Sequence, residues 1–264
     1  MNAEATNSGE PGQSDKFYRE AIEVLQKASI PFLIGGAYAF GVYTGIHRNT
    51  KDFDLFLRRN DFDRALGTLG RRGFESEKTF PHWLGKVKSG ENCIDVIYRA
   101  GNGLCEVDDL WFERARDAQV LGLSVKMCAP EEIIWMKAFI MERERFDGAD
   151  IVHIFESCAA ELDWRHLLKR FGSHWPVLLS HIVLFGYIYP SERARIPRAI
   201  TDELLQLWRD QSFRAATDRV CQGTLLSREQ YLTDIHERGF RDARLEGPDR
   251  LTSNDIEQWT NAIG

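Results

Sequence analysis

Two aspartates, Asp52 and Asp54, follow a glycine pair within a short segment of this sequence. Gly35 and Gly36 come directly after an apolar run and open a predicted helix, and the aspartates lead into a second apolar run, residues 55–57. Alternate side chains of a strand share a face, so both carboxylates should project together, with Cα atoms roughly 6.5–7 Å apart. Carboxylates beside a glycine turn at a helix N-terminus suit a divalent metal ion that carries a phosphate chain. The segment therefore predicts nucleotide chemistry.

A third carboxylate belongs to the same hypothesis. Asp95 lies inside the short apolar run 93–97, which is typical of a buried strand. An ionised side chain there is costly unless it is paired or binds a metal. If this strand lies beside that of Asp52 and Asp54, the three carboxylates can hold two divalent cations roughly 3.5–4 Å apart. One metal would orient a triphosphate, and the other, on Asp95, would activate an attacking hydroxyl whose proton Asp95 could accept.

Each part of this pattern also has a structural explanation. Asp95 could form an ion pair with Arg99 or Arg48, and an Asp-x-Asp motif is common at strand surfaces. A glycine pair after a strand is often only a turn. The combined order is far more specific: a strand, Gly-Gly, a helix, Arg-x-Thr-x-Asp-x-Asp, and then a strand that carries an aspartate.

Composition restricts the class of protein. The chain has 264 residues, 43% of them hydrophobic and 28% charged, as in ordinary globular proteins. Its net charge of −6 argues against a broad basic surface for long nucleic acids. The five scattered cysteines favour reduced thiols in the cytoplasm over a disulfide frame or a zinc site. The apolar window 175–189 is interrupted by polar residues and falls short of a membrane span, so we expect a buried helix and no membrane association.

Periodicity divides the chain near residue 129. Residues 1–14 are polar, lack a signal-peptide pattern and are expected to form a disordered leader. Residues 15–129 predict an α/β (α+β) domain, a small mixed sheet flanked by helices, and residues 130–264 predict a helical C-terminal module. The predicted helices cover about 15–28, 37–44, 61–72, 107–115, 131–143, 147–158, 164–171, 175–187 and 202–215, and the predicted strands cover 31–34, 53–57, 82–88, 92–98 and a hairpin at 119–126.

The segment Gly35-Gly36, Gly45, Arg48-x-Thr50-x-Asp52-x-Asp54-Leu55 resembles the signature of the nucleotidyltransferase superfamily, with its polymerase-β-like fold. It is most similar to the bacterial minimal nucleotidyltransferases, which include abortive-infection type toxins and several antibiotic nucleotidyltransferases. The resemblance implies an NTP substrate, Mg²⁺ or Mn²⁺ as cofactor, and a catalytic metal-binding triad of Asp52, Asp54 and Asp95. It also implies that Gly35 and Gly36 cradle the phosphates and that Arg48 and Thr50 support the loop before the strand and the nucleotide. Many relatives carry Gly-Ser where this chain has Gly-Gly, so the phosphate contacts would depend on backbone N–H groups.

A second resemblance lies further along the chain. Residues 143–151, with Lys137 before them, are similar to the helical Arg-x-Lys-Asp-x-x-Asp element of the family, except that Phe146 replaces the usual lysine. Lys137 is predicted either to reach the triphosphate, as a nucleotide-binding residue, or to extend its ammonium group to solvent. Asp147 and Asp150 are expected to pair with Arg143 or Arg145.

These observations predict a magnesium-dependent nucleotidyltransferase that moves a nucleoside monophosphate from an NTP to an acceptor hydroxyl and releases pyrophosphate. The acceptor is open among a small molecule, a protein and a tRNA. Two alternatives stand beside this prediction: a catalytically silent nucleotide-binding module of a regulatory or antitoxin-like kind, and a toxin-like tRNA nucleotidyltransferase. The presence of all three carboxylates favours catalysis.

Overall fold

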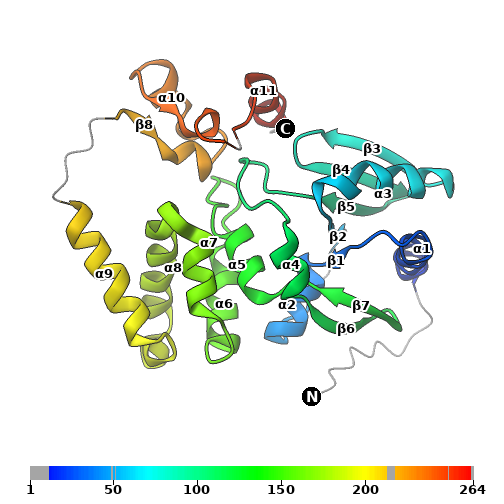
Figure 1. Ribbon diagram of the computed structural model, residues 1–264, viewed down its shortest axis with the longest axis horizontal. Helices are drawn as coiled ribbons and strands as arrows, with labels where there is room; N and C mark the ends of the chain where they lie inside the picture. Colours follow the sequence, from blue (N-terminus) through cyan, green and yellow to red (C-terminus); the bar gives the residue numbers. More distant parts are fainter. Residues whose placement is uncertain (1–11, 49, 51, 213–217, 249, 263–264) are drawn as a thin grey trace. The chain divides into compact units, whose positions relative to one another are not determined.

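The computed structural model describes residues 12–48, 50, 52–212, 218–248 and 250–262 (Figure 1). Most of the predicted leader, residues 1–11, lies outside the described residues, and Gln13 already begins the first helix. The chain folds as two compact units, residues 1–129 and residues 130–264. The first is a mixed sheet with helices and the second is mainly helical, which confirms the predicted fold class.

The first unit contains a seven-stranded mixed sheet in the order β3-β4-β5-β2-β1-β7-β6. The strands are β1 (Leu33–Ile34), β2 (Asp52–Phe56), β3 (Glu75–Phe80), β4 (Leu84–Ser89), β5 (Asn92–Ile97), β6 (Arg116–Val120) and β7 (Leu123–Met127). Strand β2 is parallel to β5 and antiparallel to β1, and β3-β4-β5 is an antiparallel meander. The sheet is larger than predicted because β3 is an edge strand whose first four residues are exposed, and so shows no apolar alternation.

Helices α1 (Gln13–Lys27) and α3 (Arg59–Arg71) pack against one face of this sheet (Figure 1). The core between them and the sheet includes Ile22 and Leu25 of α1, Leu66 and Leu69 of α3, and Phe53, Leu55, Ile94 and Val96 of β2 and β5. Since side chains alternate along a strand, the intervening residues of β2 and β5 project from the opposite face. The hydrophobic core thus determines which face carries Asp52, Asp54 and Asp95.

Two further helices complete the first unit, α2 (Gly36–Thr44) and α4 (Asp109–Glu113). Helix α2 directly follows β1, and its first residue is the second glycine of the predicted pair. Helix α2 is followed by β2 after a short loop, so the sequence from β1 to β2 forms a strand–helix–strand unit. This unit contains all the residues of the strongest sequence motif.

The second unit is built from α5 (Pro130–Lys137), α6 (Gly148–Cys158), α7 (Trp164–Phe171), α8 (Trp175–Ile188), α9 (Arg198–Ser212), α10 (Leu232–His236) and α11 (Ser253–Asn261), with a short strand pair of β8 (Val220–Cys221) and β9 (Arg241–Asp242). Helix α5 ends six residues before the predicted end at residue 143. Residues after it instead form a turn closed by a bridge between Met141 and Phe146. The prediction of a longer helix was wrong because the charged run in this turn finds partners elsewhere in the unit.

The helical stretch Trp164–Ile188 is long and apolar enough, by length and composition alone, to cross a membrane. This differs from the expectation for residues 175–189, because α7 and α8 continue into one another through a short 3₁₀ turn and so lengthen the stretch. Helix α8 buries Leu178, Ile182 and Phe185, while Tyr187 is 79% exposed.

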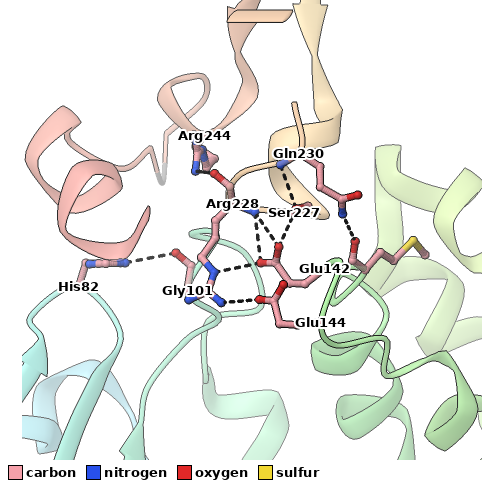
Figure 2. Close-up of polar contacts among 9 residues, drawn as sticks. His82, Gly101, Glu142, Glu144, Ser227, Arg228, Gln230 and Arg244 are labelled. Carbon is pink, nitrogen blue, oxygen red and sulfur yellow. Dashed lines mark hydrogen bonds and ion pairs between the residues drawn. The ribbon is translucent and has the colours of Figure 1, made fainter. Parts of the chain in front are cut away.

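The turn after α5 is bound to the C-terminal part of the second unit through Glu142 (Figure 2). Its carboxylate accepts hydrogen bonds from Ser227 Oγ at 2.6 Å and from Arg228 N and Nε at 3.2 Å. The Arg228 guanidinium also donates to Glu144 Oε1 at 3.2 Å. Glu142 is 9% exposed and Glu144 is 51% exposed, so the two pairs differ mainly in burial. Glu142 therefore joins these two parts of the unit, together with hydrogen bonds from Met141 N to the Leu226 carbonyl and from Gln230 Nε2 to the Met141 carbonyl.

Replacing Glu142 with alanine should lower the free energy of unfolding by about 3 kcal/mol, because it leaves Arg228 and Ser227 without their shared buried acceptor. The matched control is Glu144→Ala, which removes an exposed partner of the same arginine and should cost less than about 1 kcal/mol. Urea denaturation measures both, and hydrogen exchange of residues 219–248 should rise only in the first variant. Equal effects of the two substitutions would contradict the assignment.

Candidate functional site

Two rows of side chains cross the sheet on the face opposite α1 and α3. In the first row Asp54 of β2 is paired with Asp95 of β5, which is paired with Lys86 of β4. In the second row the equivalent positions are Asp52, Cys93 and Lys88. The parallel, in-register pairing of β2 and β5 therefore brings the three predicted carboxylates onto one face.

Asp52 and Asp95 lie close enough to share a cation, together with a residue that the sequence analysis missed. One ligand atom each of Asp52, Cys93 and Asp95 lies within 4.8 Å of the other two. Cys93 could have been found from the sequence, since it lies two residues before Asp95 on the same strand and so shares its face. Burial raises the pKa of Cys93 to about 11, and the charges of Asp95 and Asp52 add to this effect despite the opposing effect of Lys86. The thiol is therefore protonated at neutral pH.

Asp54 lies on the same face, and its carboxylate lies against the start of α2. A Cβ atom built on Gly36 would overlap Asp54 Oδ2, and one built on Gly35 would overlap the ring of Phe56. Gly36 also has a φ of 55°, a backbone angle that residues other than glycine rarely adopt. The backbone N–H of Gly35 donates to the Asp54 carbonyl at 3.1 Å. The glycine pair therefore permits β2 and its carboxylate to approach the N-terminus of α2, whose dipole favours negative charge.

The loop between α2 and β2 is held by two of the predicted residues. Thr50 Oγ1 donates to the Asp52 carbonyl at 2.8 Å and accepts from the Asp52 N–H at 3.2 Å. The Arg48 guanidinium lies over the ring of Phe40 in α2, 4.7 Å from its centroid. Gly45 ends α2 in the left-handed conformation, with a φ of 70°. Thr50 thus fixes the backbone at Asp52, while Arg48 lies against the helix.

Asp95 forms an ion pair with Lys86, whose ammonium nitrogen lies 2.7 Å from Asp95 Oδ1. The predicted partners were Arg48 and Arg99, and Lys86 was not among them. The turn at residues 89–92 contains the missing signal, because a tight turn there pairs Lys86 with Asp95 by counting along both strands. Burial opposes the charge on Lys86, but the hydrogen bond and the charge of Asp95 outweigh it and raise the pKa of Lys86.

Lys137 is in the second unit, at the end of α5, in an ion-paired cluster. Its ammonium lies 2.7 Å from Asp147 Oδ2 and 2.8 Å from Asp150 Oδ2. Arg145 also binds Asp147, at 2.8 Å, as expected for this aspartate. Burial opposes ionisation of Asp147, but Arg145 and Lys137 outweigh it and lower its pKa. With its side chain 15% exposed, Lys137 does not extend to solvent, and its role in nucleotide binding stays a prediction.

Comparison with known proteins identifies a family over most of the chain. A family model described as an uncharacterised nucleotidyltransferase matches residues 16–177, more than half of the chain. No curated protein matches this chain.

Similar solved structures include the antibiotic-resistance factor ANT(2'')-Ia, at 16% identity and a TM-score of 0.43, covering 63% of this chain and 95% of that one. The lincosamide antibiotic adenylyltransferase LnuA, solved with lincomycin, is 12% identical with a TM-score of 0.39, covering 54% of this chain and 96% of that one. JHP933 from Helicobacter pylori is 12% identical with a TM-score of 0.37, covering 76% of this chain and 97% of that one. Values this low carry no inference about a substrate.

The contact between Gly36 and Asp54 predicts the effect of a single methyl group. Gly36→Ala should cost about 1–2 kcal/mol for the left-handed backbone and a further 1–3 kcal/mol for the overlap with Asp54. Gly45→Ala is the matched control, because its φ is also positive but a Cβ there would meet no described atom within 4 Å. Thermal and urea unfolding of both variants measure the difference. If Gly36→Ala is no more destabilised than Gly45→Ala, Asp54 does not lie against the helix start.

Proposed function

Because the chain belongs to the nucleotidyltransferase family whose model matches residues 16–177, we propose that it transfers a nucleoside monophosphate from an NTP to an acceptor hydroxyl. The supporting observation is the register of β2 and β5, which gathers Asp52, Asp54 and Asp95 on one face beside the start of α2. Within the superfamily, we propose the bacterial minimal group, on the resemblance of residues 35–55.

The donor set fits a divalent metal ion. Carboxylate oxygens are the ligands that Mg²⁺ and Mn²⁺ prefer. Asp52 is exposed, and Asp54 is half-buried against the start of α2. These two carboxylates, with Asp95 beside them, would hold the ion. When bound, the ion would neutralise phosphate oxygens and orient the triphosphate for in-line attack.

In the proposed reaction the acceptor oxygen attacks the α-phosphorus. A new oxygen–phosphorus bond forms, the bond from the α-phosphorus to the bridging oxygen breaks, and pyrophosphate leaves with that electron pair. The hydroxyl proton passes to the carboxylate of Asp95 or from there to water. Since the N–H of Gly35 is used by the Asp54 carbonyl, we assign the phosphates to Gly36 and the first turn of α2, whose N–H groups have no acceptors within the helix.

The remaining predicted residues have supporting roles in this proposal. Thr50 positions the backbone of Asp52, and Arg48, exposed at the loop, supplies positive charge near the nucleotide. Lys137, in the second unit, stays a predicted nucleotide-binding residue, and its ammonium group is bound by Asp147 and Asp150. We further propose a cytoplasmic protein, in keeping with its five scattered cysteines, that acts on a small molecule, a protein or a tRNA.

Replacing Asp52 or Asp54 with asparagine should weaken binding of Mg²⁺-NTP at least tenfold and lower transfer by about 10²-fold or more, because each removes a ligand of the ion that carries the triphosphate. Asp95→Asn should leave binding within a few fold and lower transfer by a similar factor, because its contribution is made mainly in the transition state. Calorimetry measures binding, and pyrophosphate release is measured with pooled tRNA, proteins and small cationic hydroxyl compounds.

Asp117→Asn is the control, since Asp117 is an exposed residue of β6 that pairs with Lys126 at 2.8 Å. It should change neither measurement. If the wild-type protein binds Mg²⁺-NTP but releases no pyrophosphate with any acceptor, and Asp95→Asn has no effect, the nucleotide-binding module replaces the transferase. If neither Asp52→Asn nor Asp54→Asn affects metal binding, the assignment of the metal site to these aspartates is wrong.

A further inference from the structure

A cation of the protein itself already occupies the Asp95 side of the site. The ammonium nitrogen of Lys86 lies 2.7 Å from Asp95 Oδ1 and 3.9 Å from Cys93 Sγ. Asp95 and Cys93 are two of the three residues whose ligand atoms gather within 4.8 Å, the third being Asp52. The ammonium group therefore already binds one of the carboxylate oxygens that a metal ion at Asp95 would need.

The position of Lys86 is specific, as its neighbour on the same strand shows. Lys88 projects from the same face of β4 and is paired in register with Cys93. Its ammonium nevertheless lies 3.0 Å from Glu77 Oε1 of the edge strand, on the side away from β5. Lys88 is 41% exposed and Lys86 is 26% exposed. Of these two lysines, Lys86 is therefore the one directed at the carboxylates of the site.

The other ligands on this side are poorly suited to a second magnesium ion. Mg²⁺ requires near-octahedral oxygen coordination, and thiol sulfur is a ligand for softer metals. Cys93 presents sulfur at the position next to Asp95, and one Asp95 oxygen is already bound by Lys86. A divalent ion on the same oxygen would also be repelled by the ammonium group. Asp54 is placed differently, because its carboxylate lies against the start of α2.

We propose that Lys86 takes the place of the second metal ion, so that the site binds one divalent ion with the nucleotide and uses the tethered ammonium group beside Asp95. This inference rests on the proposed function of the same site. A lysine ammonium is a compact point charge with three donors. It can hold Asp95 through one donor and direct the others at an acceptor hydroxyl or a phosphate oxygen. Because it is covalently attached, it does not dissociate between reaction cycles.

The experiment counts Mn²⁺ ions bound per full-length chain, by electron paramagnetic resonance and calorimetry. The non-hydrolysable α,β-methylene analogues of ATP, GTP, CTP and UTP are each present in turn at saturation. The wild-type protein should bind one Mn²⁺ per chain with the analogue that it accepts. Lys86→Met should bind two, because the neutral side chain releases Asp95. Lys88→Met, the matched control from the same strand and face, should still bind one.

Each outcome decides the proposal. Two ions in the wild-type protein, or one ion in both the wild-type protein and Lys86→Met, would overturn it while leaving the proposed transfer intact. Absence of Mn²⁺ binding to wild-type protein with every analogue would overturn the proposed function as well. If Lys86→Met does not fold, Lys86→Gln provides the same neutral change. Two Mn²⁺ ions per wild-type chain would overturn the proposal without any variant. Loss of a merely structural ion pair would not change the number of ions bound.

Discussion

The constraint on which the site depends is the crowding of negative charge across β2 and β5. Two unit charges about 5 Å apart repel by roughly 3 kcal/mol at an effective dielectric constant of 20. The in-register pairing of the two strands makes this repulsion unavoidable once Asp52, Asp54 and Asp95 are present. Compensation comes from the ammonium group of Lys86 beside Asp95 and from the N-terminus of α2 beside Asp54. A divalent metal ion held by these carboxylates would add further positive charge to the cluster.

Each unit contains a cluster of lysine and aspartate side chains, and the two clusters differ in the ratio of cations to carboxylates. In the first unit Lys86 binds Asp95, and ligand atoms of Asp52 and Cys93 lie within 4.8 Å of that carboxylate. In the second unit Lys137 is bound by both Asp147 and Asp150, and Arg145 adds a second cation. The second cluster is therefore compensated within the protein. This difference is why the metal hypothesis belongs to the first cluster, although the sequence shows lysines and aspartates in both.

Sequence alone was sufficient where local patterns determine structure. The alternation in β2 and β5 and the glycine pair predicted the strand–helix–strand unit, the mixed fold and the shared face of Asp52 and Asp54. Gly36 contacts Asp54 only because β2 pairs with β1. The motif alone does not predict this pairing of strands. Lys86 was missed because an ion pair between strands depends on register, although the turn before Asn92 encodes that register. The edge strand β3 was missed because exposure removes its apolar alternation.

The helical unit was predicted less well for a related reason. The periodicity of residues 131–143 favours a continuous helix, but Glu142 binds Arg228 and Ser227, which are distant in sequence. Such partners cannot be identified from a local pattern. The last forty residues have short elements that are fixed by ion pairs and turns, among them the buried pair of Arg244 and Asp242. The sequence of such a segment is expected to show only weak hydrophobic periodicity.

In the proposed reaction Asp52 and Asp54 bind the metal ion that carries the nucleotide. Anomalous diffraction at the manganese edge, from crystals grown with Mn²⁺ and a bound α,β-methylene NTP analogue, locates that ion directly. We expect an anomalous peak within about 2.0–2.6 Å of carboxylate oxygens of both aspartates, with the analogue's phosphates at the start of α2. A nucleotide bound elsewhere, or a peak that contacts neither aspartate, would contradict it.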